Sequence, residues 1–83
     1  MADKKIGIIT HFFDKISVGI IKLDGKLKVG DKVRIQGGKT NFEQEISEIQ
    51  LEHESIPEGK KGQEVGVKVN EKVREGDGVY LLE

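Results

Sequence analysis

The sequence contains no cysteine and no tryptophan, a single proline, three phenylalanines and one tyrosine. Without cysteine the chain has neither a disulfide framework nor thiolate chemistry, and secreted domains of this size often depend on disulfides. No apolar stretch approaches the roughly 20 residues of a membrane span. The polar start Met1–Lys5 does not resemble a signal peptide. We therefore expect a cytoplasmic protein that has no contact with membranes.

The residues that usually carry catalysis or metal binding are also scarce. The two histidines, His11 and His53, lie far apart in the sequence, and neither belongs to a cluster with metal-ligand spacing. No serine stands in a glycine-flanked elbow. The segment 37–40 matches only the end of a phosphate-binding loop, because the first glycine of that motif is absent. The sequence predicts no enzyme activity, no metal or other cofactor, and no nucleotide binding of its own.

The chain has 83 residues, of which 35% are hydrophobic, 35% are charged and eleven are glycine. This length corresponds to one domain with one modest core. We expect a single domain over residues 1–83, with its core between about residues 5 and 82. The many glycines indicate tight turns between short elements.

Strand patterns dominate the sequence, because β-branched and aromatic residues gather in short runs or alternate with polar ones. Six or seven short strands separated by glycine turns, with no confident helix, are typical of an all-β barrel or sandwich. The strand segments are Lys5–Phe13, Ser17–Leu23, Asp31–Gln36, Phe42–Glu54, Glu64–Val69 and Val79–Leu82.

The segment Phe42–Glu54 changes phase in its middle. Phe42 and Ile46 share one parity, whereas Ile49 and Leu51 share the other. A β-bulge near Ser47–Glu48 would return Ile49 and Leu51 to the core side of one long strand. A helix is the alternative interpretation, since the spacing also fits a period of 3.6 residues, but no helix cap is evident.

Glycine pairs and Gly-Asp steps mark the expected turns. Asp24–Gly25 is typical of a hairpin turn. Gly37–Gly38 ends a strand at a point where positive φ angles are open to glycine. In Val29–Asp31 we expect Gly30 to adopt a positive φ and the carboxylate of Asp31 to accept hydrogen bonds from nearby backbone amides.

Several phrases in a fixed order resemble a known family. They are Gly25–Ile35 (GKLKVGDKVRI), Ile46–Leu51 (ISEIQL), Gly62–Val67 (GQEVGV) and Val73–Val79 (VREGDGV). Together they resemble the second domain of elongation factor Tu and related translational GTPases. The resemblance covers about Lys5 to Leu82 and implies a small closed Greek-key barrel. The C-terminal domain of collagenase-like peptidases also resembles this barrel, so the fold alone does not settle the function.

The resemblance also implies where a binding pocket for the aminoacyl end of transfer RNA would lie. In this chain the corresponding positions are altered: Gln50 replaces an acid, Glu52 an aromatic residue and His53 a basic residue, while Glu64 adds a carboxylate. A carboxylate repels phosphate, and the stacking surface of the aromatic residue is lost. We therefore do not expect this chain to hold the end of a transfer RNA.

The charge distribution supports a first functional hypothesis. Residues 1–40 carry nine Lys and Arg against four Asp, whereas residues 41–83 carry five against eleven Asp and Glu. A non-catalytic, translation-factor-like module would contact RNA or a ribosome-associated or other translation protein, without a role for DNA. The bland alternative is that these are solubility charges. The candidate contact residues are Lys22, Lys26, Lys28, Lys32 and Arg34, of which Lys32 and Arg34 share one outward face.

Phe12 and Phe13 motivate a second hypothesis, an accessory protein-interaction domain that works with a separate enzyme chain such as a collagenase-like peptidase. Strand alternation sends these two side chains to opposite faces. Either at least one of them lies outside the core, or neighbouring strands cover both.

Overall fold

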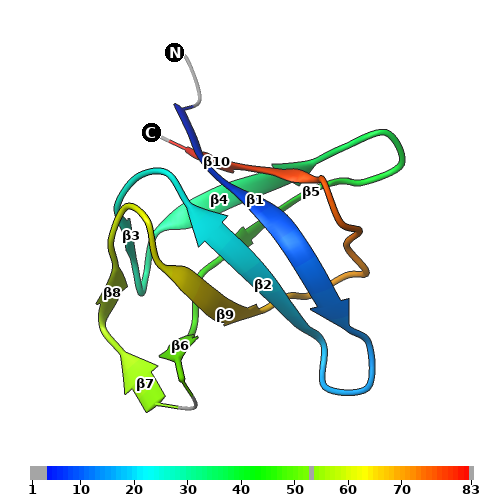
Figure 1. The fold of residues 1–83 in the computed structure, drawn as a ribbon. Coiled ribbons are helices and arrows are strands. Elements are labelled where there is room, and N and C mark those ends of the chain that lie inside the picture. The colour runs from blue at the N-terminus through cyan, green and yellow to red at the C-terminus, as the bar shows by residue number, and fades with distance from the viewer. Residues whose placement is uncertain (1–3, 53, 83) are drawn as a thin grey trace.

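Ten strands build the fold in the computed structural model, which describes residues 4–52 and 54–82 (Figure 1). The expected all-β class is confirmed, but the expected number of six or seven strands is too low for the described residues. None of the described residues lies in a helix, so the described structure holds no helix that could span a membrane. The strands are β1 (Lys4–Phe13), β2 (Val18–Leu23), β3 (Leu27–Lys28), β4 (Lys32–Gln36), β5 (Asn41–Glu45), β6 (Ile49–Leu51), β7 (Glu54–Ile56), β8 (Glu58–Gly59), β9 (Glu64–Lys68) and β10 (Gly78–Leu81).

Eight of these strands form one antiparallel sheet in the order β5-β4-β10-β1-β2-β9-β6-β7, and β3 pairs with β8 in a second sheet. The sheet curls, so that β4 and β5 lie behind β1 and β2 in Figure 1. It does not close, because β5 and β7 are its two ends and do not pair with each other. The prediction of a closed Greek-key barrel is therefore wrong.

A side chain ties β5, one end of the sheet, to the chain at the end of β9. Gln44 of β5 is buried, and its Nε2 donates a hydrogen bond of 2.8 Å to the backbone oxygen of Lys68. Its Oε1 accepts a hydrogen bond of 2.8 Å from the backbone N–H of Asn70. One amide group thus joins β5 to the end of β9 without a backbone ladder.

The described residues of Phe42–Glu54 include strands and no helix, so the helix alternative is wrong, but they do not form one bulged strand. β5 ends at Glu45, and β6 begins at Ile49 in a different part of the sheet. β5 pairs with β4, whereas β6 pairs with β7 and β9. The change of phase in the sequence marks a crossing from one region to the other. Ile46 anchors the crossing, since it is buried and donates its N–H to the oxygen of Asp31 at 2.8 Å.

The core inside the curled sheet is entirely aliphatic. Alternation along the strands supplies it, because every second residue points inward. Phe12, Phe42, Leu51, Ile56 and Leu81 pack against it while only partly buried. The fully buried members are Ile6, Ile9, Ile21, Leu23, Leu27, Val33, Ile35, Ile46, Ile49, Val65, Val67, Val69, Val73 and Val79.

Three four-residue turns share one geometry. In Lys28–Asp31 the N–H of Asp31 bonds to the oxygen of Lys28, Gly30 has a φ of 95°, and the carboxylate of Asp31 accepts the N–H of Lys28 at 2.9 Å. The same pattern recurs in Lys60–Gln63 and in Arg74–Asp77. A positive φ at the third residue is what a type II turn requires. The predicted Gly-Asp turn is thus confirmed.

Two other glycine predictions are wrong. Asp24–Gly25 is not a hairpin turn, because β2 pairs with β1 and β9 and not with β3. Gly37 and Gly38 do not adopt positive φ. Gly37 is needed for space, since a Cβ there would meet the carboxylate of Asp77 at 1.9 Å.

Candidate interaction surface

The outward side chains of β1, β2, β9 and β6 form a continuous surface, because these four strands are neighbours in the sheet. We call this surface the outer face. Ile21 of β2, Val65 and Val67 of β9 and Ile49 of β6 are fully buried. The residues that alternate with them therefore point away from the core.

Apolar side chains run along the outer face. Phe13 pairs directly with Val18, so the two side chains lie on the same side of the sheet. Ile20 follows on β2 and Ile8 lies further along β1, while Ile16 stands in the turn between the two strands. Ile8 is 41%, Phe13 51% and Ile16 62% exposed. We call Ile8, Phe13, Ile16, Val18 and Ile20 the apolar strip.

Phe12 and Phe13 lie on opposite faces of the sheet, as strand alternation predicts. Phe12 pairs with Gly19 and packs against the core, whereas Phe13 is half exposed on the outer face. The expectation that at least one of them lies outside the core is confirmed.

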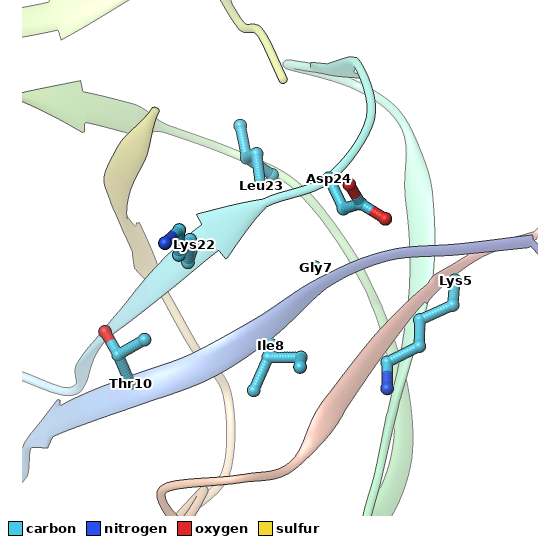
Figure 2. Close-up of a pocket in the computed structure, with 7 residues that line it drawn as sticks. All are labelled: Lys5, Gly7, Ile8, Thr10, Lys22, Leu23 and Asp24. Carbon is cyan, nitrogen blue, oxygen red and sulfur yellow. The ribbon is translucent and has the colours of Figure 1, made fainter. Parts of the chain in front are cut away.

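One end of the outer face holds a hollow of about 380 Å³ between β1 and β2. Figure 2 shows Ile8 in the middle of its lining, with Thr10 and Lys22 toward one end and Lys5 and Asp24 toward the other. Gly7 and Leu23 complete the lining. The walls are mostly apolar, and two lysines stand at the rim.

The other end holds a second hollow of about 240 Å³, which we call the Gly66 hollow. Gly66 of β9 pairs with Ile20 of β2 on one side and with Gln50 of β6 on the other. Gln50, Glu52 and Glu64, three of the altered pocket positions, meet here. The fourth, His53, lies outside the described residues. Ile16, Val18 and Ile20 of the apolar strip form the remaining lining.

The backbone conformation at position 66 does not require a glycine, because Gly66 does not have a positive φ. The glycines with positive φ are Gly30, Gly62 and Gly76. A Cβ on Gly66 would meet Val18 Cγ1 at 3.3 Å and Ile20 Cδ1 at 3.5 Å, and the nearest backbone atom at 3.8 Å. The missing side chain of Gly66 leaves the hollow open on the outer face.

The two carboxylates at this hollow are held differently. Glu52 has a φ of 52°, in the left-handed region that non-glycine residues rarely adopt. Glu64 lies in β9, and one of its oxygens accepts a weak hydrogen bond of 3.5 Å from the hydroxyl of Thr10. Within residues 4–52 and 54–82, neither carboxylate has a cation within ion-pair distance.

The five basic residues that the sequence suggested as contact residues do not line one common hollow. Lys22 lies on β2, Lys26 and Lys28 lie at β3, and Lys32 and Arg34 lie on β4. Carboxylates stand opposite several of them in the sheet: Glu64 faces Lys22, and Glu45 faces Lys32. The guanidinium of Arg34 lies 2.7 Å from the carboxylate of Glu43. A role of these residues in binding stays a prediction.

Lys26 forms an ion pair with Glu58 of β8, with 3.1 Å between Nζ and Oε2. The hydrogen bond from Lys26 is the largest cause that lowers the pKa of Glu58, burial opposes it, and the positive charges of Lys26, Lys28 and Lys60 each lower the pKa a little further. This pair joins the two strands of the small sheet.

The remaining polar groups form no catalytic arrangement among the described residues. His11 makes an exposed contact of 3.4 Å with Glu75. No group of three His, Asp or Glu in the described ranges could hold a metal ion. The described surface has an apolar strip and two hollows, the first lined by two lysines and one aspartate and the second by two glutamates.

No family model matches the chain. An uncharacterized protease of Methanocaldococcus jannaschii is 44% identical to it over 79 residues, which are 94% of this chain and 19% of that protein. A collagenase of Porphyromonas gingivalis is 32% identical over 80 residues, which are 94% of this chain and 22% of the collagenase. The chain therefore spans about a fifth of the length of the curated relatives it matches.

A solved structure shares the fold. It is described as the C-terminal domain of a U32 peptidase of Geobacillus thermoleovorans, and it superposes with a TM-score of 0.91 at 18% identity. The match covers 96% of this chain and 93% of that chain. At this identity the likeness concerns the fold alone.

These similarities overturn the inferred kinship with translational GTPases. The relatives by sequence are named as a protease and a collagenase, and the structural neighbour that shares the fold is a domain of a peptidase; none of them is an elongation factor. The hypothesis of a translation-factor-like module is accordingly wrong. Contact with RNA, taken by itself, stays a prediction. The findings favour the second hypothesis, an accessory domain beside an enzyme.

Proposed function

We propose that this chain is a non-catalytic accessory domain that docks onto the enzymatic part of a U32-peptidase-like or collagenase-like protein. The observation that carries the proposal is the extent of the sequence match. Nearly the whole chain corresponds to about a fifth of two proteins named as a protease and a collagenase. The other four-fifths of those relatives leave ample room for a separate catalytic unit.

The chemistry of the described residues supports a docking role over a catalytic one. A hydrolase needs a nucleophile with a base, or a metal with an open position. The described residues offer instead an apolar strip, four of whose five members line two hollows, and exposed apolar patches rimmed by polar residues are typical of interaction sites. Such an attachment would resemble the modest interfaces between domains of one chain.

The test uses the Methanocaldococcus jannaschii relative from which the 79 matching residues have been deleted. Isothermal titration of this chain into that truncated protein should give saturable binding with one chain per enzyme part. The isolated chain should hydrolyse neither gelatin nor casein. Absence of binding, or peptide hydrolysis by the isolated chain, would contradict the proposal.

A further inference from the structure

We propose that the Gly66 hollow receives a bulky apolar side chain of the docking partner, and that a basic residue next to this side chain pairs with Glu52 and Glu64. The identity of the partner rests on the proposed function, whereas the chemistry of the site rests on the hollow itself. The occupant is thus a protein segment that presents an apolar and a basic residue side by side.

The apolar half of the site follows from its walls. Val18 and Ile20 flank Gly66 across β2, and both are only partly buried. A Cβ at position 66 would already lie in contact with Val18 and Ile20, so a side chain inserted by a partner at this point would contact the same two walls. Removing this apolar surface from water would favour binding.

The expectation of a basic residue on the partner follows from two carboxylates of the hollow that lack an ion pair within the described ranges. Glu52 and Glu64 both line the hollow, and neither forms an ion pair within the described ranges. Covering the hollow with an apolar segment alone would remove water from two carboxylates without compensation, which is costly. A lysine or arginine from the partner would supply the missing counter-charge, and an acidic partner would be rejected.

The position of the hollow agrees with docking rather than with enclosure of a free small molecule. It opens onto the apolar strip, where Ile16 is 62% exposed. A partner that fills the hollow would therefore also cover this isoleucine. Lys22 lines the first hollow and stands opposite Glu64 in the sheet, so it would lie beside the same partner.

The site can be tested without the enzyme part, by recording ¹⁵N–¹H correlation spectra of the chain during titration with a dipeptide. The probe is N-acetyl-leucyl-arginine amide, and N-acetyl-leucyl-glutamate amide is its matched control. We expect the arginine probe to shift the amide signals of Ile20, Gln50 and Gly66, and the glutamate probe to shift them far less. Equal effects of the two probes, or shifts that do not cluster on β2, β6 and β9, would overturn the proposal.

Substitution of Gly66 provides a second test of the proposed site. Gly66→Val should fill the hollow and abolish the clustered shifts caused by the arginine probe. Gly38→Val is the matched control, because Gly38 lacks positive φ and a Cβ there would meet nothing within 4 Å. Unchanged shifts in a folded Gly66→Val variant would overturn the proposal. Glu52→Gln combined with Glu64→Gln keeps the hollow open and should remove the preference for arginine.

The same variants separate this inference from the proposed function. In the calorimetric titration against the truncated Methanocaldococcus protein, Gly66→Val should weaken binding about tenfold or more, the equivalent of one buried contact. If the wild-type chain binds that protein and Gly66→Val binds it equally well, the hollow is not the docking site and the proposed function stands. If the arginine probe binds at the hollow but the truncated protein does not bind, the inference about the site stands and the proposed function falls.

Discussion

A positive backbone φ usually occurs at glycine, but Glu52 has a positive φ whereas Gly66 does not. Glu52 is not a glycine, yet it has a φ of 52°. Gly66 is a glycine inside a strand, where its lack of a side chain weakens the strand and its backbone does not call for it. Both residues line the same hollow. Since neither choice favours stability, the pair points to a function of that surface.

The first prediction concerns Glu52. Glu52→Gly should raise the free energy of unfolding by about 1 kcal/mol, because glycine adopts the left-handed region without a steric penalty. Chemical denaturation would measure this gain, and the same variant should bind the arginine dipeptide more weakly. Glu54→Gly, in the neighbouring strand β7, is the control and should lose about 0.5–1 kcal/mol instead. A loss of stability in Glu52→Gly would contradict this account.

The second prediction concerns the ion pair between Lys26 and Glu58. The pKa of Glu58 lies below its ordinary value of 4.5 in the folded chain. The pair therefore stabilises the fold above that value, and its contribution disappears as the pH falls through the folded pKa. Lys26→Met should raise the pKa of Glu58, as measured by ¹³C NMR of its carboxyl group, and should flatten the acid side of the stability profile. An unchanged pKa would show that Lys26 is not the cause.

At the residue scale, the sequence predicted what local chemistry dictates. Gly30 and Asp31 behave as a Gly-Asp turn requires, because positive φ and side-chain capping are properties of the four residues themselves. The role of Gly66 could not be predicted in this way. It depends on which side chains two other strands place beside it, and those strands lie far away in the sequence.

At the scale of elements, the turn Arg74–Asp77 is tied more firmly into the fold than its counterpart Lys28–Asp31. Asp77 is 4% exposed, and its carboxylate accepts the N–H of Arg74 at 2.9 Å. Its backbone oxygen also accepts the N–H of Ile9 at 2.8 Å. In the other turn, the bond from Lys28 to Asp31 is exposed.

The third prediction follows from this difference. Asp77→Ala should lower the free energy of unfolding by about 2 kcal/mol, because it leaves a partly buried N–H without its charged acceptor. Asp31→Ala, which removes the same bond at the surface, should cost about 0.5–1 kcal/mol. Thermal or urea denaturation of both variants would measure the difference. Equal losses would mean that burial does not set the strength of these turns.

The fourth prediction concerns the gap in the sheet that Gln44 bridges. Gln44→Met should destabilise the fold by about 2 kcal/mol or more, because the backbone oxygen of Lys68 and the N–H of Asn70 lose their partners. Gln36→Met is the control on an exposed position and should change stability by less than about 0.5 kcal/mol. Denaturation curves that do not distinguish the two variants would contradict the bridging role.

Gln44 also explains why the closed barrel could not be excluded from the sequence. The strands themselves were largely predictable, because alternation reports which face of each strand is buried. Closure depends on how two strand ends meet, and a single glutamine in an alternating segment gives no sign that it bonds across that gap. The phase change near Ser47–Glu48 was visible in the sequence, but a bulge and a crossing produce the same pattern.

At the scale of the whole molecule, the turn and strand phrases mark a β scaffold and do not identify its function. The phrases that suggested a translation factor are turn and packing signals, and such signals recur in unrelated proteins that need the same turns. The altered pocket positions were the better guide. Gln50, Glu52 and Glu64 do meet at one hollow, as a shared pocket requires, but their chemistry favours a cation over a nucleic acid.

The claim that the outer face docks onto an enzyme part is most directly tested by methyl NMR. The chain would carry labelled isoleucine and valine methyl groups, and spectra would be compared before and after addition of the truncated Methanocaldococcus protein. We predict that the signals of Ile8, Ile16 and Ile20 shift or broaden, while those of Val29, which is 45% exposed in the turn after β3, stay unchanged. Perturbation of Val29 with no change at these three isoleucines, or no perturbation at all, would contradict the account.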